Sequence, residues 1–118
     1  MWRPILLVTT GVLMASQPAY ANLDDVARVE KLLELCNQPT GAKTAPQGVD
    51  AGICLGYISG VLETFDMLQR ICAPKVTPSI DPIEPIIRYL NMHSEMKQWL
   101  APIAILTAGE TVYPCAKR

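Results

Sequence analysis

Four cysteines, one histidine and two close pairs of carboxylates are the side chains that could serve a chemical site. Catalysis by a nucleophile would need a free thiol or an activated serine beside a histidine. The only histidine, His93, falls at a predicted helix-helix corner, where a capping or hinge role suits it. The carboxylate pairs Asp24-Asp25 and Glu63-Asp66 fall on helix ends or exposed helix faces. We therefore predict no catalytic residues and no enzyme activity; the protein acts by binding.

The cysteines favour disulfides over a metal site. They are an even number in a short chain: Cys36, Cys54, Cys72 and Cys115. Such a count in an exported chain indicates a disulfide framework. A zinc site is not expected, because no two cysteines are close in sequence and a single histidine is present. We predict neither a metal nor a cofactor.

The amino terminus has the pattern of a cleavable signal peptide. Arg3 precedes an apolar run over residues 5–15, and Ala19-Tyr20-Ala21 is the small-x-small pattern of a cleavage site. The run is shorter than the roughly 20 residues of a membrane-spanning helix. We predict cleavage between Ala21 and Asn22, a signal peptide over 1–21, and export of a single helical domain over 22–118, with no membrane attachment.

The mature chain is small and weakly acidic. Removing 21 of the 118 residues leaves 97, a size at which one hydrophobic core is marginal without staples. Without Arg3, nine basic residues face eleven acidic ones, a formal charge of about −2 with no basic stripe. Nucleic acid is not an expected partner, because binding to it depends on neutralising phosphates with Lys and Arg.

Apolar residues recur at helical spacing in four segments. The predicted helices cover residues 23–36, 50–72, 82–91 and 94 to about 112. Asp50 and Ser94 are expected to cap the second and fourth helices, and Ser79 or Asp81 the third. Pro102 should kink the fourth helix, which should fray from Gly109. With no alternating strand segment, the fold class is all-α, a small four-helix antiparallel bundle stapled by two disulfides.

Three glycines share one face of the second predicted helix. Gly52, Gly56 and Gly60 are four residues apart, and each costs about 1 kcal/mol of helix stability relative to Ala. Such a cost suggests a use for the bare backbone. We expect a helix packed closely on this face, from the same chain or from a partner subunit.

Helix geometry restricts the pairing of the cysteines. Cys54 and Cys72 are 18 residues apart at opposite ends of the second helix, about 27 Å at 1.5 Å per residue. Disulfides need Cα atoms within about 7 Å, so these two cannot pair. An antiparallel hairpin brings Cys36 to Cys54, which leaves Cys72 for Cys115.

Several segments together resemble a known family. They are Cys54-Leu55-Gly56-Tyr57-Ile58-Ser59-Gly60, Cys72-Ala73-Pro74 with Val76-Thr77, Tyr89-Leu90 with His93 and Glu95, and Tyr113-Pro114-Cys115. In this order, over about residues 36–115, they look like the Rap/Tai immunity proteins of bacterial type VI secretion systems. Two features depart from that pattern: Ser94 follows the histidine where the family usually has Pro, and Pro82 and Pro85 alter the start of the third predicted helix.

The resemblance implies a periplasmic helical protein, commonly a homodimer, that binds a peptidoglycan amidase toxin and occludes its cleft. The third helix and its flanking turns, here roughly Lys75 to Glu95, would contribute to the contact. It assigns no individual contact residue. A different binding function is an acid-stress chaperone of the HdeA kind, also small, helical and disulfide-bonded. Protonation of the carboxylates near pH 2 to 3 would leave such a chain strongly positive and open its dimer.

Overall fold

The structure is a computed structural model that describes residues 27–37 and 45–116, together with Gly11. The predicted signal peptide and the cleavage position at Ala21 and Asn22 lie outside these residues. The described part contains four α-helices, one 3-10 turn and no strand, so the predicted all-α fold is confirmed. The elements are α2 (Val29–Cys36), α3 (Ala45–Met67), α4 (Glu84–Met92), η1 (Ser94–Met96) and α5 (Ala101–Val112).

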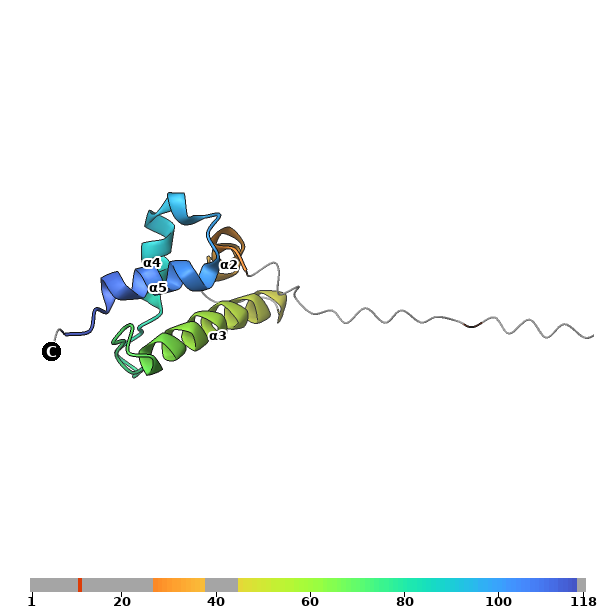
Figure 1. Ribbon diagram of the computed structural model, residues 1–118. Coiled ribbons are helices and arrows are strands. Elements are labelled where there is room, and N and C mark those ends of the chain that lie inside the picture. Colours follow the sequence, from red (N-terminus) through yellow and green to blue (C-terminus); the bar gives the residue numbers. More distant parts are fainter. Residues whose placement is uncertain (1–10, 12–26, 38–44, 117–118) are drawn as a thin grey trace, which may run out of the picture.

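The four helices form a small bundle around one core (Figure 1). Helix α2 packs against α3 and α4, and α5 packs against α3 and α4. In Figure 1, α3 and α5 run in the same direction along one side of the molecule. The fully buried side chains that fill the space between helices are Val29, Leu32, Ile58, Ile71, Ile86, Leu90 and Ile105.

Helix α2 begins at Val29, not at residue 23 as predicted. Residues 23–26 are outside the described part, and Ala27 and Arg28 are not helical. These two residues pair with the start of α5 instead: the Ala27 carbonyl accepts the Ala101 N–H at 2.7 Å, and Val29 N–H donates to the Trp99 carbonyl at 3.1 Å. Backbone pairing across the bundle therefore takes the place of helical structure at Ala27 and Arg28.

Helix α3 begins at Ala45, so the predicted start at residue 50 with a cap at Asp50 is wrong. Pro46 favours a loop at this position when the sequence is considered alone. In the first turn of a helix, however, Pro is accepted because its missing N–H has no partner there. Asp50 lies in the second turn.

Helix α3 also ends earlier than predicted, at Met67 rather than near Cys72. Gln69 adopts φ 58°, the left-handed conformation. Arg70 N–H donates to the Phe65 carbonyl and Gln69 N–H to the Asp66 carbonyl, both at 2.9 Å. This pair of bonds is a Schellman motif, which satisfies the last carbonyls and turns the chain out of the helix. Glycine usually occupies the position that Gln69 takes here.

The third helix follows the prediction within two residues. The N-cap of α4 is Ile83 and not Ser79 or Asp81 as predicted; Asp81 Oδ1 instead accepts the Ile83 N–H at 2.9 Å in the turn before the helix. Pro85 lies in the first turn, where it is tolerated. Ile86 and Leu90 are fully buried, as the apolar stripe predicted.

The fourth predicted helix is divided in two. Ser94–Met96 form the short turn η1, and α5 begins only at Ala101 with extended Leu100 before it. Pro102 is therefore in the first turn of α5, and the predicted kink and the Ser94 cap of a continuous helix are wrong. Because α5 begins at Ala101, a different set of its residues faces the core. Trp99, Leu100 and Ile103 are apolar residues of the predicted fourth helix, but they are 41%, 44% and 53% exposed.

Small residues instead form the inner face of α5. The buried residues of this helix are Ala101, Ala104, Ile105, Ala108 and Gly109. The predicted fraying from Gly109 is wrong, because the helix continues to Val112. A Cβ added at Gly109 would meet the Cγ2 and Cδ1 atoms of Ile71 at 3.1 and 3.2 Å. The glycine thus permits close packing of α5 on the segment that follows α3.

Both predicted disulfides are present. Cys36 pairs with Cys54, with Cα atoms 5.1 Å apart, and Cys72 pairs with Cys115, with Cα atoms 4.9 Å apart. The first bond joins the end of α2 to α3. The second bond joins the chain just after α3 to the chain just after α5, and no cysteine is left free.

Candidate partner-binding surfaces

The three glycines of α3 lie on an open face. Gly52, Gly56 and Gly60 are exposed, and within the described residues no atom lies within 4 Å of a Cβ built on any of them. No helix of the described residues covers this face, so the described part of the chain does not supply the closely packed helix that we expected. The partner-subunit alternative remains a prediction.

A shallow groove of about 400 Å³ lies on this face. We call it the glycine groove; its lining residues are Gly56, Tyr57, Gly60, Val61, Thr64, Phe65 and Pro102. None of them is charged. Residues 51–62 of α3 hold no charged side chain at all, and Leu55 in that stretch is 47% exposed. Helix α3 therefore presents apolar surface both to the core and to solvent, whereas a surface helix usually has a polar outer face.

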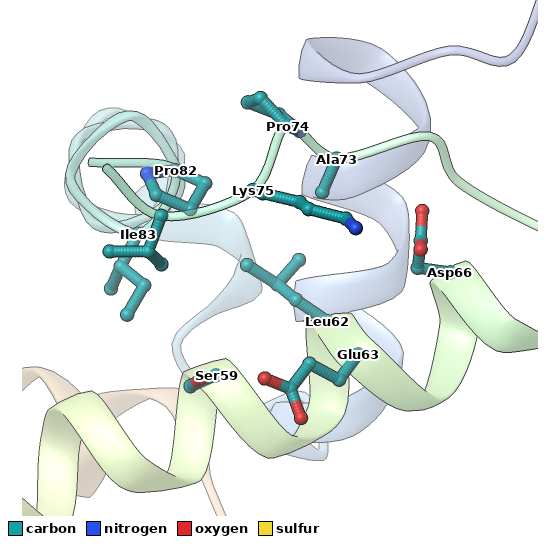
Figure 2. A pocket seen from close by; sticks show the side chains of 10 residues that line it. Ser59, Leu62, Glu63, Asp66, Ala73, Pro74, Lys75, Pro82 and Ile83 are labelled. Carbon is teal, nitrogen blue, oxygen red and sulfur yellow. The ribbon is translucent and has the colours of Figure 1, made fainter. Parts of the chain in front are cut away.

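A second groove, of about 350 Å³, lies between α3 and the segment that leads to α4 (Figure 2). We call it the acidic groove. Its lining residues are Ser59, Leu62, Glu63, Asp66, Ala73, Pro74, Lys75, Val76, Pro82 and Ile83. Leu62 and Ile83 are only 4% and 7% exposed and form part of an apolar floor. In Figure 2, Lys75 extends across the groove from the linker side toward Asp66 on α3.

The rim of the acidic groove carries three charged side chains. No ion pair or side-chain hydrogen bond joins Glu63, Asp66 or Lys75 to another residue of the described part. All three are exposed, and both carboxylates lie on α3, three residues apart. The formal charge of the rim is −1. The sequence pointed to Glu63 and Asp66 only as solvated helix residues; the groove beneath them is made by a segment distant along the chain.

Within the segment that leads from α3 to α4, the chain makes a tight turn. Thr77 and Ile80 exchange two backbone hydrogen bonds of 3.1 Å. Val76 and Ile80, which flank the turn, are 68% and 44% exposed. A turn held by backbone hydrogen bonds, with apolar side chains toward solvent, suits a binding surface, because little conformational entropy is lost when it binds.

Tyr113 fixes this segment to the carboxyl end of α5. Its hydroxyl donates to the Pro82 carbonyl at 2.8 Å. Burial raises the pKa of Tyr113 above its ordinary value, and the negative charges of Asp81 and Glu84 raise it further. The phenol therefore keeps its proton, and with it the hydrogen bond, to higher pH than a free tyrosine does.

His93 lies at the corner between α4 and η1, as the sequence predicted. Its Nδ1 is 2.7 Å from the Tyr89 carbonyl, and its ring stacks on the Tyr89 ring with centroids 3.8 Å apart. The hydrogen bond satisfies a carbonyl in the last turn of α4. These contacts support the capping role.

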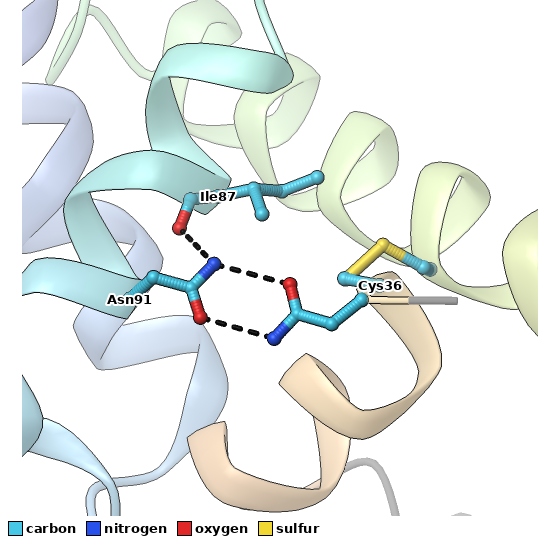
Figure 3. The surroundings of a disulfide bond; sticks show 5 residues. Cys36, Ile87 and Asn91 are labelled. Atoms are coloured by element: carbon cyan, nitrogen blue, oxygen red, sulfur yellow. Dashed lines mark hydrogen bonds between the residues drawn. A yellow bond between two sulfur atoms is a disulfide. The ribbon is translucent and has the colours of Figure 1, made fainter. Parts of the chain in front are cut away.

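A pair of amides connects the end of α2 to α4 beside the first disulfide (Figure 3). Asn37 and Asn91 exchange two side-chain hydrogen bonds of 3.0 and 3.1 Å, and Asn91 also donates to the Ile87 carbonyl. Sequence reasoning missed this contact, because the two asparagines are 54 residues apart and no local pattern links them. Together with Cys36–Cys54, it holds α2, α3 and α4 in fixed relation.

The described residues offer neither a metal site nor a membrane-spanning helix. They contain no group of three or more His, Cys, Asp or Glu side chains placed to hold a metal ion. Within the same residues, no helix has both the length and the apolar character required to cross a bilayer.

Comparison with known protein families identifies the class. The family model described as Rap1a immunity proteins matches residues 28–115, which include all four helices and both disulfides. The chain therefore belongs to the Rap1a immunity protein family. Searches of curated proteins and of solved structures found no significant match.

Proposed function

We propose that this protein is a periplasmic immunity protein that binds and occludes a peptidoglycan amidase toxin of a type VI secretion system. The observation that carries the proposal is the family match, which spans the whole described domain. Membership supports a protein toxin as partner. The amidase class and the periplasm come from the resemblance to the Rap/Tai proteins and from the chemistry below.

The disulfides support the periplasm as the site of action. Structural disulfides persist in oxidising compartments, and the bacterial periplasm is one. Both bonds join segments that are distant along the chain. A signal peptide over residues 1–21, cleaved before Asn22, would deliver the chain there as a single domain over 22–118. An amidase that cuts peptidoglycan would act in the same compartment.

The surface proposed to meet the toxin covers residues 75–95. It includes the turn between Thr77 and Ile80, and helix α4. Val76 is 68% and Met92 74% exposed, so this surface offers apolar anchors at both ends. Burial of such side chains against a cleft is what gives a protein-protein contact most of its free energy. Inhibition by occlusion needs no catalytic group on the inhibitor.

Co-expression tests the proposal. The candidate toxin is any peptidoglycan amidase that is encoded beside this chain, exported to the periplasm of a laboratory host. We expect it to lyse the cells when expressed alone, and co-expression of residues 1–118 to restore growth. A variant without residues 1–21 should fail to protect, because it stays in the cytoplasm. Continued lysis in the presence of the exported, oxidised protein would contradict the proposal.

We also propose that the protein is a homodimer that pairs through the glycine groove. A charge-free stretch over 51–62 with exposed Leu55 supports this, because an apolar helix face is normally covered. The glycines would let the backbones of two α3 helices approach closely. In a two-fold pair the same patch serves both subunits.

Sedimentation of the mature protein tests the dimer. Gly56→Arg places a long charged side chain in the groove, and we expect it to produce a monomer. Thr111→Arg, an exposed position on α5 outside the groove, is the control and should stay dimeric. A wild-type protein that is monomeric at 100 micromolar, or a Gly56→Arg variant that is as dimeric as the control, would refute this interface.

A further inference from the structure

We infer that the acidic groove receives the side chain of an arginine from the bound protein partner. The inference rests on the proposed function to the extent that the partner is the toxin. It adds a named subsite, and the chemistry of its occupant, to a surface so far defined only as residues 75–95. The floor, the rim and the position of the groove each support it.

The floor of the groove suits the alkyl stem of a long side chain. Leu62 and Ile83 are almost completely buried, and Pro82 beside them is buried as well. A volume of about 350 Å³ is at the small end of ligand sites, which span about 300–1,000 Å³. Long cationic side chains cover apolar surface with their methylenes and keep the charged head at the rim.

The rim supplies the charge that selects a cation. Glu63 and Asp66 are three residues apart on α3, a spacing that places side chains on the same side of a helix. Neither has an ion-pair partner in the described part of the chain. Arginine fits better than lysine, because its planar guanidinium has five donors in a fork that can bridge two carboxylates.

Lys75 is the resident cation of the groove. Its side chain extends over the groove from the linker toward Asp66 (Figure 2), yet it forms no ion pair there. An incoming guanidinium therefore has no bond to break, but it does meet the charge of Lys75. Removal of that charge changes the rim from −1 to −2 and should favour the occupant.

The groove adjoins the surface proposed for the toxin. Lys75 and Val76 line it, and the turn between Thr77 and Ile80 follows directly. A partner that covers Val76 and Ile80 thus passes over the mouth of the groove. A groove beside an apolar contact is a common position for a charged anchor, since the surrounding contact excludes water.

The groove can be tested without a toxin. The probe is N-acetyl-arginine N-methylamide, titrated into the oxidised protein and followed by backbone amide NMR. The control probe is the norleucine analogue, which has a similar stem and no charge. We expect saturable shifts at Ser59, Leu62 and Ala73 with arginine only, and none in the double variant Glu63→Gln/Asp66→Asn. Equal shifts with both probes, or shifts that persist in the double variant, would overturn the inference.

The amidase from the co-expression assay provides the second arm. We expect Glu63→Gln/Asp66→Asn to weaken its binding about 10- to 100-fold, the range for charge-assisted hydrogen bonds. Lys75→Gln should tighten binding about 2- to 5-fold. Glu34→Gln, an exposed carboxylate on α2, is the matched control and should change binding less than about twofold.

The two failures are distinguishable. If wild type inhibits the amidase and the double variant binds it equally well, the arginine subsite is wrong and the proposed function stands. If wild type inhibits no amidase, the proposed function fails, and the arginine probe alone decides whether the groove accepts a guanidinium. All of the substituted side chains are exposed, so thermal unfolding should confirm that the variants fold.

Discussion

Alanine at Gly56 and alanine at Gly109 should change the stability of the monomer in opposite directions. Both glycines are inside helices, where replacing Gly by Ala stabilises the helix by about 1 kcal/mol. Their surroundings differ. No atom of the described residues lies within 4 Å of a Cβ at Gly56, so the whole gain should appear there. At Gly109 the new methyl would meet two carbons of Ile71 at 3.1 and 3.2 Å.

At Gly109, steric crowding should cancel or exceed the gain in helix stability. Ile71 is fully buried, so it has little room to move. An extra methyl in a packed core costs about 1–3 kcal/mol. Gly109→Ala should therefore lower the free energy of unfolding by up to about 2 kcal/mol, whereas Gly56→Ala should raise it by about 1 kcal/mol. For a domain of this size, 1 kcal/mol is about 4–8 °C in Tm.

The assay is urea unfolding of the oxidised mature protein, followed by tryptophan fluorescence at a concentration low enough to keep the chain monomeric. Trp99 near the start of α5 reports on the fold. A stabilising Gly56→Ala beside a neutral or destabilising Gly109→Ala is the expected result. Destabilisation by Gly56→Ala under these conditions would mean that the α3 face is covered within the monomer, and would refute the reasoning.

Three further perturbations test the fold. Replacement of Cys72 and Cys115 by Ala should lower the free energy of unfolding by about 4 kcal/mol, measured by urea unfolding, because this bond closes a loop with a sequence separation of 43. Gln69→Gly should raise Tm by about 4–8 °C, since a left-handed residue other than glycine costs about 1–2 kcal/mol and glycine recovers part of this. Tyr113→Phe should lower stability at pH 7 by about 1 kcal/mol through loss of the hydrogen bond to Pro82. Because the folded pKa of Tyr113 is raised, its contribution is intact below about pH 10 and falls as the pH rises further, so the Phe variant should lose less stability between pH 9 and 11 than wild type.

Sequence patterns predicted the parts of the fold that depend on local spacing. The disulfide pairing was predictable because Cys54 lies inside a helix and Cys72 lies beyond its carboxyl end, which keeps the two apart and excludes one pairing. The inner face of α4 was predictable from the spacing of Ile86 and Leu90. Asp81 was recognisable as a residue near the start of this helix, because a carboxylate there accepts a backbone N–H, here that of Ile83.

Other features depend on contacts that local patterns do not contain. The end of α3 rests on Gln69 in a conformation typical of glycine, so no sequence signal marks it. The start of α5 depends on backbone pairing of Ala27 with Ala101, residues far apart in the chain. Apolar Trp99 and Ile103 suited a longer helix equally well.

The candidate binding surfaces, like the fold, were predictable only where local spacing determines them. The three glycines were noticed from their spacing, but only the structure reveals that the face is open in the monomer. The acidic groove requires α3 and the segment around Pro82 to meet, which the positions of Glu63 and Asp66 alone do not indicate. Family membership defines the kind of partner, and the grooves offer testable places for the contact.

Titration of a candidate peptidoglycan amidase toxin with the oxidised mature protein, residues 22–118, tests the central claim most directly. Cleavage of purified peptidoglycan is followed by release of soluble muropeptides. We predict complete inhibition at one inhibitor subunit per enzyme, and its loss after reduction and unfolding of the inhibitor. An amidase that keeps its full rate in excess folded protein would contradict the claim, and binding only of heterogeneous acid-denatured proteins would point to a chaperone instead.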